Sequence, residues 1–165
     1  MANSRFTLLP YAAEFPSTAF PQLMAIHSTE RRAALAFDAS TVESCRWTFV
    51  APQGLTGTMN AIIYYCMASA TADSVNFEVS IEAVTTEDAL DLDAATSFDT
   101  MNDGHETVPG TAGYMSLLAV ALTNADSMAA GDLVRLKLER DADDGTDDTA
   151  TGDAYVLAVE FRDAV

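Results

Sequence analysis

The stretch SVNFEVSIEAV, residues Ser74–Val84, decides the fold. Apolar side chains occupy residues 75, 77, 79, 81 and 83, and Ser, Asn and Glu occupy the residues between them. A period of two places the apolar set on one face of a β-strand and the polar set on the opposite face. The stretch therefore predicts a half-buried strand, whose apolar face needs a second layer of structure to cover it.

Similar segments lie on both sides of this strand and are separated by turn-forming residues. They cover residues 33–40, 43–52, 58–70, 114–123, 129–140 and 153–163. Between residues 85 and 109 lies a long acidic connection, in which a short helix or an irregular strand is expected. With about eight strands and no long helical pattern, the chain is predicted to be all-β, an antiparallel β-sandwich of jelly-roll type.

The turn PQGLTG, residues 52–57, predicts a β-hairpin between the segments that flank it. The pairs expected on its core face are Phe49 with Ile62, Trp47 with Tyr64, and Cys45 with Cys66. This register brings the two thiols close together. A directly paired cross-strand disulfide is strained, and a cytoplasm is reducing, so two buried free thiols are expected rather than a disulfide.

Residues 1–33 follow neither period and are predicted to form an extended N-terminal arm ahead of a sandwich domain at residues 34–165. Proline at residues 10, 16 and 21 interrupts any regular element. Exposed aromatic side chains need a surface, either on the chain's own sandwich or on another protein. The arm residues expected to bind a neighbouring subunit or a capsid are Phe6, Leu8, Leu9, Tyr11, Phe15 and Phe20. Deleting the arm is expected to abolish that association and to leave the sandwich folded.

The chain is strongly acidic, with 25 Asp and Glu residues, 8 Lys and Arg residues and a formal net charge of −17. Such a charge repels phosphate backbones and anionic lipid headgroups, so no nucleic-acid or membrane partner is expected. No apolar run approaches the ~18 residues of a membrane span, and the N-terminal residues lack the pattern of a signal peptide. Synthesis in a cytoplasm is expected.

The loop RDADDGTDDTATGD, Arg140–Asp153, holds six of the Asp residues. Its spacing does not fit an EF-hand, because counting from Asp141 places Gly145 one position too early and Gly152 where the bidentate Glu belongs. A solvated loop rich in turn formers is the favoured interpretation. An irregular calcium site is the alternative, and its candidate ligands are Asp141, Asp143, Asp144, Asp147 and Asp148.

No residue pattern recommends catalysis, so the chain is predicted not to be an enzyme. His27 and His105 lie outside any metal-ligand spacing or nucleophile motif and are expected to be surface or loop residues. A carbohydrate-binding module is an alternative, because β-sandwiches often bind sugars on exposed aromatic rings. Trp47 falls on the expected core face, which leaves Tyr65 and Tyr114 as the candidate exposed rings, although ordinary packing is the favoured interpretation of both.

The runs at residues 35–57, 62–84, 107–144 and 149–162 resemble the jelly-roll domains of tailed-phage structural proteins. The likeness rests on the overall residue pattern of these runs and on short motifs such as AAGD before one strand and TGDA before the last strand. It implies a capsid decoration (cement) protein or the head domain of a tail fibre. Decoration proteins of this kind commonly form trimers on the capsid lattice, with terminal arms that reach neighbouring subunits.

The residues and the resemblance together predict a non-enzymatic virion structural protein, made in the host cytoplasm. It is expected to bind the major capsid protein as a homotrimer and to stabilise the outer shell, without a cofactor unless the acidic loop takes calcium. The alternative is a tail-fibre or spike head, or a carbohydrate-binding β-sandwich module, that recognises surface glycans.

Overall fold

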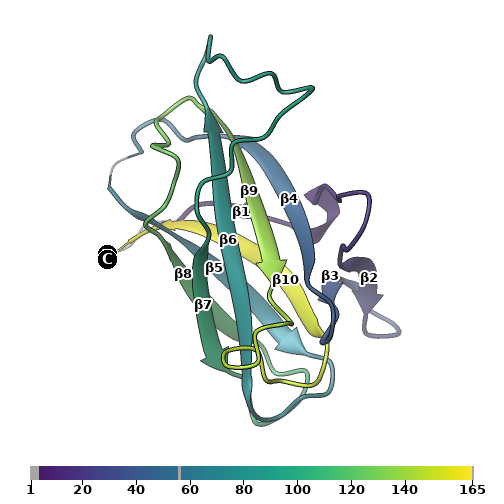
Figure 1. Cartoon of the computed structure of the whole chain (residues 1–165). Helices are drawn as coiled ribbons and strands as arrows, with labels where there is room; N and C mark the ends of the chain where they lie inside the picture. Colours follow the sequence, from purple (N-terminus) through teal and green to yellow (C-terminus); the bar gives the residue numbers. More distant parts are fainter. Residues whose placement is uncertain (1–3, 56, 165) are drawn as a thin grey trace.

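The computed structural model describes residues 4–55 and 57–164, and it consists of two antiparallel β-sheets packed face to face (Figure 1). The strands are β1 (Ser4–Leu8), β2 (Gln22–Ile26), β3 (Arg32–Phe37), β4 (Glu43–Val50), β5 (Met59–Met67), β6 (Ser74–Val84), β7 (Asn102–Thr107), β8 (Ser116–Leu122), β9 (Leu133–Arg140) and β10 (Ala154–Asp163). One 3₁₀ turn, η1 (Pro10–Ala12), lies between β1 and β2. The described part of the chain has no helix long and apolar enough to cross a membrane.

One sheet has six strands and the other has four. The six-stranded sheet has the order β2-β3-β10-β5-β8, with β1 paired to the second half of β10 beyond the end of β3, and the four-stranded sheet has the order β4-β9-β6-β7. Neighbours in each sheet are mostly far apart in sequence, as jelly-roll connections require. The predicted antiparallel jelly-roll sandwich is confirmed, with ten strands where about eight were expected.

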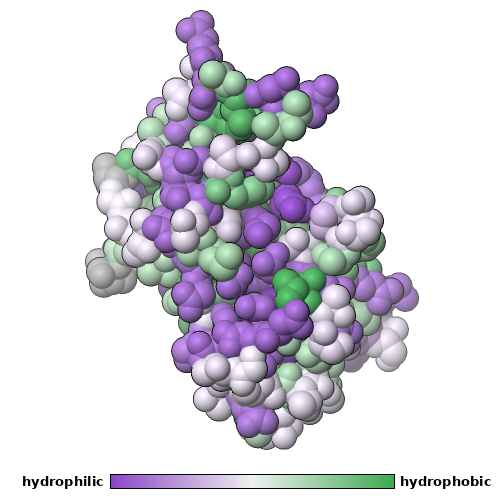
Figure 2. Space-filling model, viewed as in Figure 1, coloured by the Kyte–Doolittle hydropathy of each residue, from purple (hydrophilic) through white to green (hydrophobic). Residues whose placement is uncertain are grey.

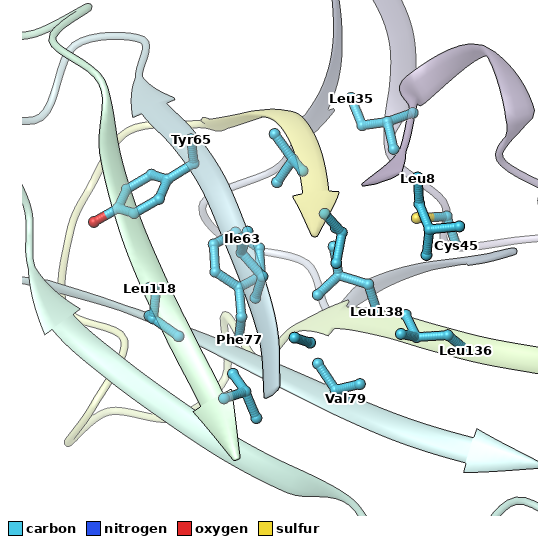
Figure 3. Close-up of a cluster of buried hydrophobic side chains, with 14 of the residues drawn as sticks. Leu8, Leu35, Cys45, Ile63, Tyr65, Phe77, Val79, Leu118, Leu136 and Leu138 are labelled. Carbon is cyan, nitrogen blue, oxygen red and sulfur yellow. The ribbon is translucent and has the colours of Figure 1, made fainter. Parts of the chain in front are cut away.

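The core lies between the sheets and is filled by alternate side chains of the facing strands (Figure 3). Phe77 of β6 contacts Phe37 of β3 and Tyr65 of β5, with ring centroids 5.6 Å and 6.0 Å apart. Trp47 of β4 is 1% exposed, as its expected core position requires. Full burial of one such side chain stabilises the fold by about 1.5–3 kcal/mol.

The opening stretch forms β6, and its apolar face is buried as predicted. Its polar face is buried too, because Asn76, Ser80 and Glu82 are almost inaccessible to solvent. Loops cover this face: the backbone N–H of Ser97 donates to Glu82 Oε2 at 2.6 Å, and the N–H of Asn76 donates to Asp148 Oδ2 at 3.1 Å. The half-buried expectation is therefore wrong for the polar face, since alternation along a strand cannot show which loops will fold over it.

The expected hairpin between residues 43–52 and 58–70 is wrong. β4 pairs with β9 in the four-stranded sheet, whereas β5 pairs with β8 and β10 in the other sheet. The connection between them crosses from one sheet to the other. β5 is apolar on both faces, and the core contains its odd-numbered residues, so Ile62, Tyr64 and Cys66 face outward. Both cysteines are free and buried, as predicted.

The N-terminal segment is extended and lies along the sandwich rather than projecting from it. Phe6 of β1 packs against Phe161 and Phe49, with ring centroids 5.0 Å and 4.6 Å apart. The indole N–H of Trp47 donates to the carbonyl of Leu9 at 3.0 Å. β2 pairs with β3 over its whole length, and the expected domain boundary after residue 33 falls inside β3.

Candidate functional site

The two outer faces of the sandwich differ in polarity. The outer face of the four-stranded sheet carries charged side chains such as Arg46, Glu78 and Lys137, and the surface above it is mostly hydrophilic (Figure 2). The outer face of the six-stranded sheet instead carries Leu117, which is 44% exposed, and Leu157, among other apolar or small side chains, whereas Ile62 on the same face is buried. An apolar sheet face in so acidic a chain marks a candidate interaction surface.

A groove of about 470 Å³ crosses this apolar face, and we call it the sheet groove. Strands β2, β3, β5 and β10 and the loop before β8 supply its lining. The lining residues are Ile26, Arg32, Tyr64, Cys66, Gly113, Met115, Leu157 and Ala158. They come from four separate segments of the sequence, so the fold alone brings them together.

Two local features shape the sheet groove. The register of β10 against β5 shifts between Val156 and Ala158, so a bulge inserts Leu157 beside Ala158 on the groove wall. Gly113 has φ +79°, a left-handed conformation that favours glycine, and its N–H donates to the carbonyl of Met67 at 2.9 Å. That bond holds the loop over the end of β5, where Met115 forms the opposite wall.

A hydrogen-bonded network lies on the same face beside the sheet groove. The hydroxyl of Tyr64 donates to Glu160 Oε2 at 2.9 Å, and Arg162 donates both to the Tyr64 hydroxyl at 3.1 Å and to Glu160. The hydrogen bond to Glu160 and burial raise the pKa of Tyr64, so the phenol stays protonated. The network therefore fixes the orientation of the Tyr64 ring.

The thiol in the sheet groove is not suited to nucleophilic chemistry. Burial raises the pKa of Cys66, and the positive charge of Arg32 only partly opposes that rise. Burial also raises the pKa of Cys45, which lies in the core. Both side chains therefore remain thiols at neutral pH, and a thiolate is the form that reacts.

The acidic loop contains one structural carboxylate rather than a set of free ones. Asp148 forms a bidentate ion pair with Arg140, with both N···O distances 2.8 Å, and both side chains are buried. Arg140 also donates to the carbonyls of Phe37, Ala150 and Gly152. Asp148 thus attaches the acidic loop to Arg140 at the end of β9.

Another carboxylate of the acidic loop, that of Asp144, stabilises a turn within the loop. Asp144 Oδ1 accepts from the N–H groups of Thr146 and Asp147, and these bonds lower the pKa of Asp144. Asp141 and Asp143 precede this turn, and no group of three or more His, Cys, Asp or Glu residues able to hold a metal occurs within residues 4–55 and 57–164. The calcium alternative remains a prediction.

The two histidines lie in different surroundings on the surface. His105 Nδ1 lies 3.5 Å from Asp147 Oδ2, on the outer side of β7. His27 occupies the β2–β3 turn at φ +67°, where its Nδ1 accepts the N–H of Glu30 at 3.0 Å. Each histidine is therefore a surface or loop residue, as expected, and neither lines the sheet groove.

The six arm residues fall into two groups. Phe6 packs against the core and Leu8 is buried in it, so these two side chains are already occupied within the chain's own sandwich. The exposed group is Leu9, Tyr11, Phe15 and Phe20, of which Tyr11 is 73% exposed. The rings of Phe15 and Phe20 lie 5.5 Å apart. Only the exposed group is accessible to another protein, and its role there remains a prediction.

Of the two tyrosines considered as exposed rings, one is exposed and the other is buried. Tyr114 is 66% exposed, as the carbohydrate-binding alternative expects, and its chain neighbours Gly113 and Met115 line the sheet groove. Tyr65 is fully buried, and its hydroxyl donates to Glu106 at 3.1 Å, so this ring has the ordinary packed role that was the favoured interpretation. The sequence analysis missed Tyr64, because the incorrect hairpin register placed it in the core.

Two further hollows are weaker candidates. One, of about 310 Å³, lies under the acidic connection that follows β6, where Glu87 and Asp88 line it. The other, of about 500 Å³, is a polar depression between the turn before β5 and the turn after β8. Neither is lined by an aromatic ring, whereas the sheet groove has Tyr64 in its lining, and Tyr114 lies in the chain between two of its lining residues.

No protein-family profile and no curated protein sequence matches the chain. Solved structures that match include the CBM22-2 xylan-binding domain of Paenibacillus barcinonensis Xyn10C, with TM-score 0.52, 14% identity, 96% of this chain and 99% of that chain covered. The CBM22-1 xylan-binding domain of the same protein matches with TM-score 0.50 and 10% identity, and the match covers 98% of this chain and 94% of that chain. Carbohydrate-binding module CBM36, in complex with calcium and xylotriose, matches with TM-score 0.48 and 18% identity, and the match covers 94% of this chain and 98% of that chain.

Likeness at this level of identity concerns the fold. The chain shares the jelly-roll β-sandwich with these carbohydrate-binding modules. The expected resemblance to phage structural proteins is thus supported for the fold, while its phage origin and capsid role gain no support from these matches.

Proposed function

We propose that the chain is a non-catalytic binding module that takes a glycan in the sheet groove. The observation that carries this proposal is the groove itself, with the fixed ring of Tyr64, apolar walls and hydrogen-bonding groups at its edge. A sugar ring has an apolar C–H face and a rim of hydroxyl groups. A site with apolar and aromatic surfaces and a few placed polar groups is complementary to both.

The ligand class to test first follows from the fold. Two solved domains that share it are named xylan-binding. Xylo-oligosaccharides are therefore the first probes, within a wider set of plant and bacterial-surface glycans.

The test is isothermal titration calorimetry with these oligosaccharides on the wild type and three variants. Tyr64→Ala removes the ring and is expected to weaken binding about tenfold or more, as loss of a central aromatic contact does. Tyr64→Phe keeps the ring but loses the hydroxyl network, so a smaller loss is expected. Tyr11→Ala, on the N-terminal segment, is the matched control and should bind as the wild type does.

Fluorescence of Trp47, the single tryptophan, checks that each variant is folded. Equal binding by folded Tyr64→Ala and wild type would contradict the placement of the site. Failure of every glycan in the set to bind would contradict the proposed function.

A virion structural role is a second candidate, and the exposed apolar group Leu9, Tyr11, Phe15 and Phe20 favours it. In this role the group docks on a neighbouring subunit or on the major capsid protein. The same variants separate the two candidates, because Tyr11→Ala would then reduce the oligomeric mass measured by light scattering and Tyr64→Ala would not. A wild-type monomer that binds glycan would favour the first candidate over the trimer.

A further inference from the structure

The charge of the sheet groove is opposite to the charge of the protein. The chain has 25 acidic and 8 basic residues, yet among the described residues that line the groove only Arg32 is charged. The carboxylate nearest in the network, Glu160, is paired with Arg162. No carboxylate is among the described residues that line the groove, and Glu160 beside it is bonded to Tyr64 and Arg162, which indicates a ligand that an unpaired carboxylate would repel.

Arg32 is one of three basic residues, with Arg31 and Arg46, for which the described ranges show no salt bridge, and of these three it alone lines the groove. Five of the eight basic residues form salt bridges with carboxylates. Arg32 forms no salt bridge within the described ranges, although it is exposed at the start of β3 beside Ile26 of β2. Arg32 and Cys66 both line the groove, so the Arg32 side chain borders it. An unpaired guanidinium over an apolar groove is free to take an anionic group.

We propose that the ligand is a uronic-acid oligosaccharide whose carboxylate pairs with Arg32, a proposal that rests on the proposed glycan site. A guanidinium presents two parallel N–H donors, which fit the two oxygens of a carboxylate. The walls formed by Ile26, Met115 and Leu157 then contact the C–H face of the same sugar. A single Arg in a protein of net charge −17 suits one carboxylate per site, whereas a densely sulfated or phosphorylated chain would be repelled.

The test compares each acidic oligosaccharide with its own methyl ester, which removes the charge and keeps the sugar. The probes are oligogalacturonate and glucuronic-acid-substituted xylo-oligosaccharide, each as free acid and as methyl ester, together with the unsubstituted xylo-oligosaccharide. Titration at about 0.15 M salt limits the long-range repulsion, because the Debye length is then about 8 Å. The wild type is expected to bind at least one free acid about tenfold to 100-fold more tightly than its ester.

Two single-charge variants assign this preference to a residue. Arg32→Gln should bind the acid and the ester equally, and Arg32→Lys should keep part of the preference. Arg31→Gln is the matched control, because it removes the same charge from the adjacent turn residue, which does not line the groove. It should keep the full preference.

Each outcome decides between the two proposals. Equal binding of acid and ester by the wild type, or the same loss in Arg31→Gln as in Arg32→Gln, overturns the role of Arg32. Binding of the unsubstituted xylo-oligosaccharide alone overturns the uronic-acid ligand and leaves the glycan-binding function standing. Failure of all the probes and of the wider glycan set overturns both proposals. The acid-against-ester comparison on the wild type needs no variant, so it holds even if a variant misfolds.

Discussion

At the scale of single residues, Arg140 and Asp148 form a buried ion pair that is costly to break. Both side chains are almost inaccessible, and Arg140 fills its remaining hydrogen-bonding positions with three backbone carbonyls. A buried pair with all donors satisfied is stable as a unit, but each half is costly to leave alone. The acidic loop therefore depends on this pair for its attachment to the sandwich.

Asp148→Asn is expected to destabilise the fold by about 3–5 kcal/mol, because it leaves the Arg140 guanidinium buried without a counter-charge. Urea denaturation followed by the fluorescence of Trp47 measures the effect. Asp143→Asn removes the same charge from an exposed position of the loop and should change the midpoint little. Similar midpoints for the two variants would show that the pair does not hold the loop.

Glu78 provides a pH dependence at the same scale. It lies opposite Glu139 on one neighbouring strand and Asp103 on the other. Burial and the nearby charges of Asp141 and Glu139 raise its pKa from 4.5 to about 7. A raised pKa in the folded state means that the folded protein binds the proton more tightly than the unfolded chain does. The contribution to stability is therefore full below pH 4.5 and is lost as the pH rises through about 7.

Glu78→Gln removes this titration and should stabilise the protein relative to the wild type at pH 8. The advantage should shrink steadily between pH 8 and pH 5, as measured by thermal unfolding at each pH. Glu30→Gln, in the exposed β2–β3 turn, provides the control. A stability difference that does not change with pH would contradict the raised pKa of Glu78.

At the scale of elements, the N-terminal segment is part of the sandwich. β1 extends the six-stranded sheet at β10, and Phe6 completes a cluster with Phe49 and Phe161. Backbone bonds also join Glu14 to Arg46 and Ala19 to Ser44, so the segment covers the free edge of β4. The sandwich is thus expected to lose stability on deletion of residues 1–33, contrary to the expectation drawn from the sequence.

Phe6→Ala tests this contribution without removing the whole segment. A core Phe→Ala change lowers the free energy of unfolding by about 3–5 kcal/mol. Because Phe6 is only partly buried, the expected loss of stability is about 2–3 kcal/mol. Phe20→Ala removes the same ring from the exposed group and should cost less than about 1 kcal/mol. Chemical denaturation of both variants measures the difference, and equal losses would contradict the packing role of β1.

β5 shows why the sequence predicted the fold class better than the site. Its residues are apolar on both faces, so the pattern could not distinguish Ile62, Tyr64 and Cys66 from the odd-numbered residues that face the core. The expected hairpin, which does not form, assigned the even-numbered residues to the core and so hid the ring that lines the sheet groove. The doubly apolar run was itself the available signal, because a strand of this kind is covered on both sides or lies beneath a binding surface.

At the scale of the whole molecule, the site depends on topology that the sequence pattern does not contain. Alternation in β6 and β9 was sufficient to predict a sandwich, because it needs only local spacing. The sheet groove requires β3 beside β10 and β10 beside β5, pairs that are distant in the chain. The bulge at Leu157 interrupts the alternation of the two faces of β10, so a strict period of two does not predict it.

The pairing of β1 with β10 also places the start of the first described strand beside the end of the last described strand. Ser4 lies opposite Arg162, so the first and last described strands end at one corner, at the Cα separation of about 5 Å that is typical of a strand pair. A short peptide linker would close the backbone into a ring with little distortion, and cyclisation removes entropy from the unfolded chain. The same geometry would let the whole domain be inserted into a surface loop of another protein through two adjacent linkers, with both sheets left intact.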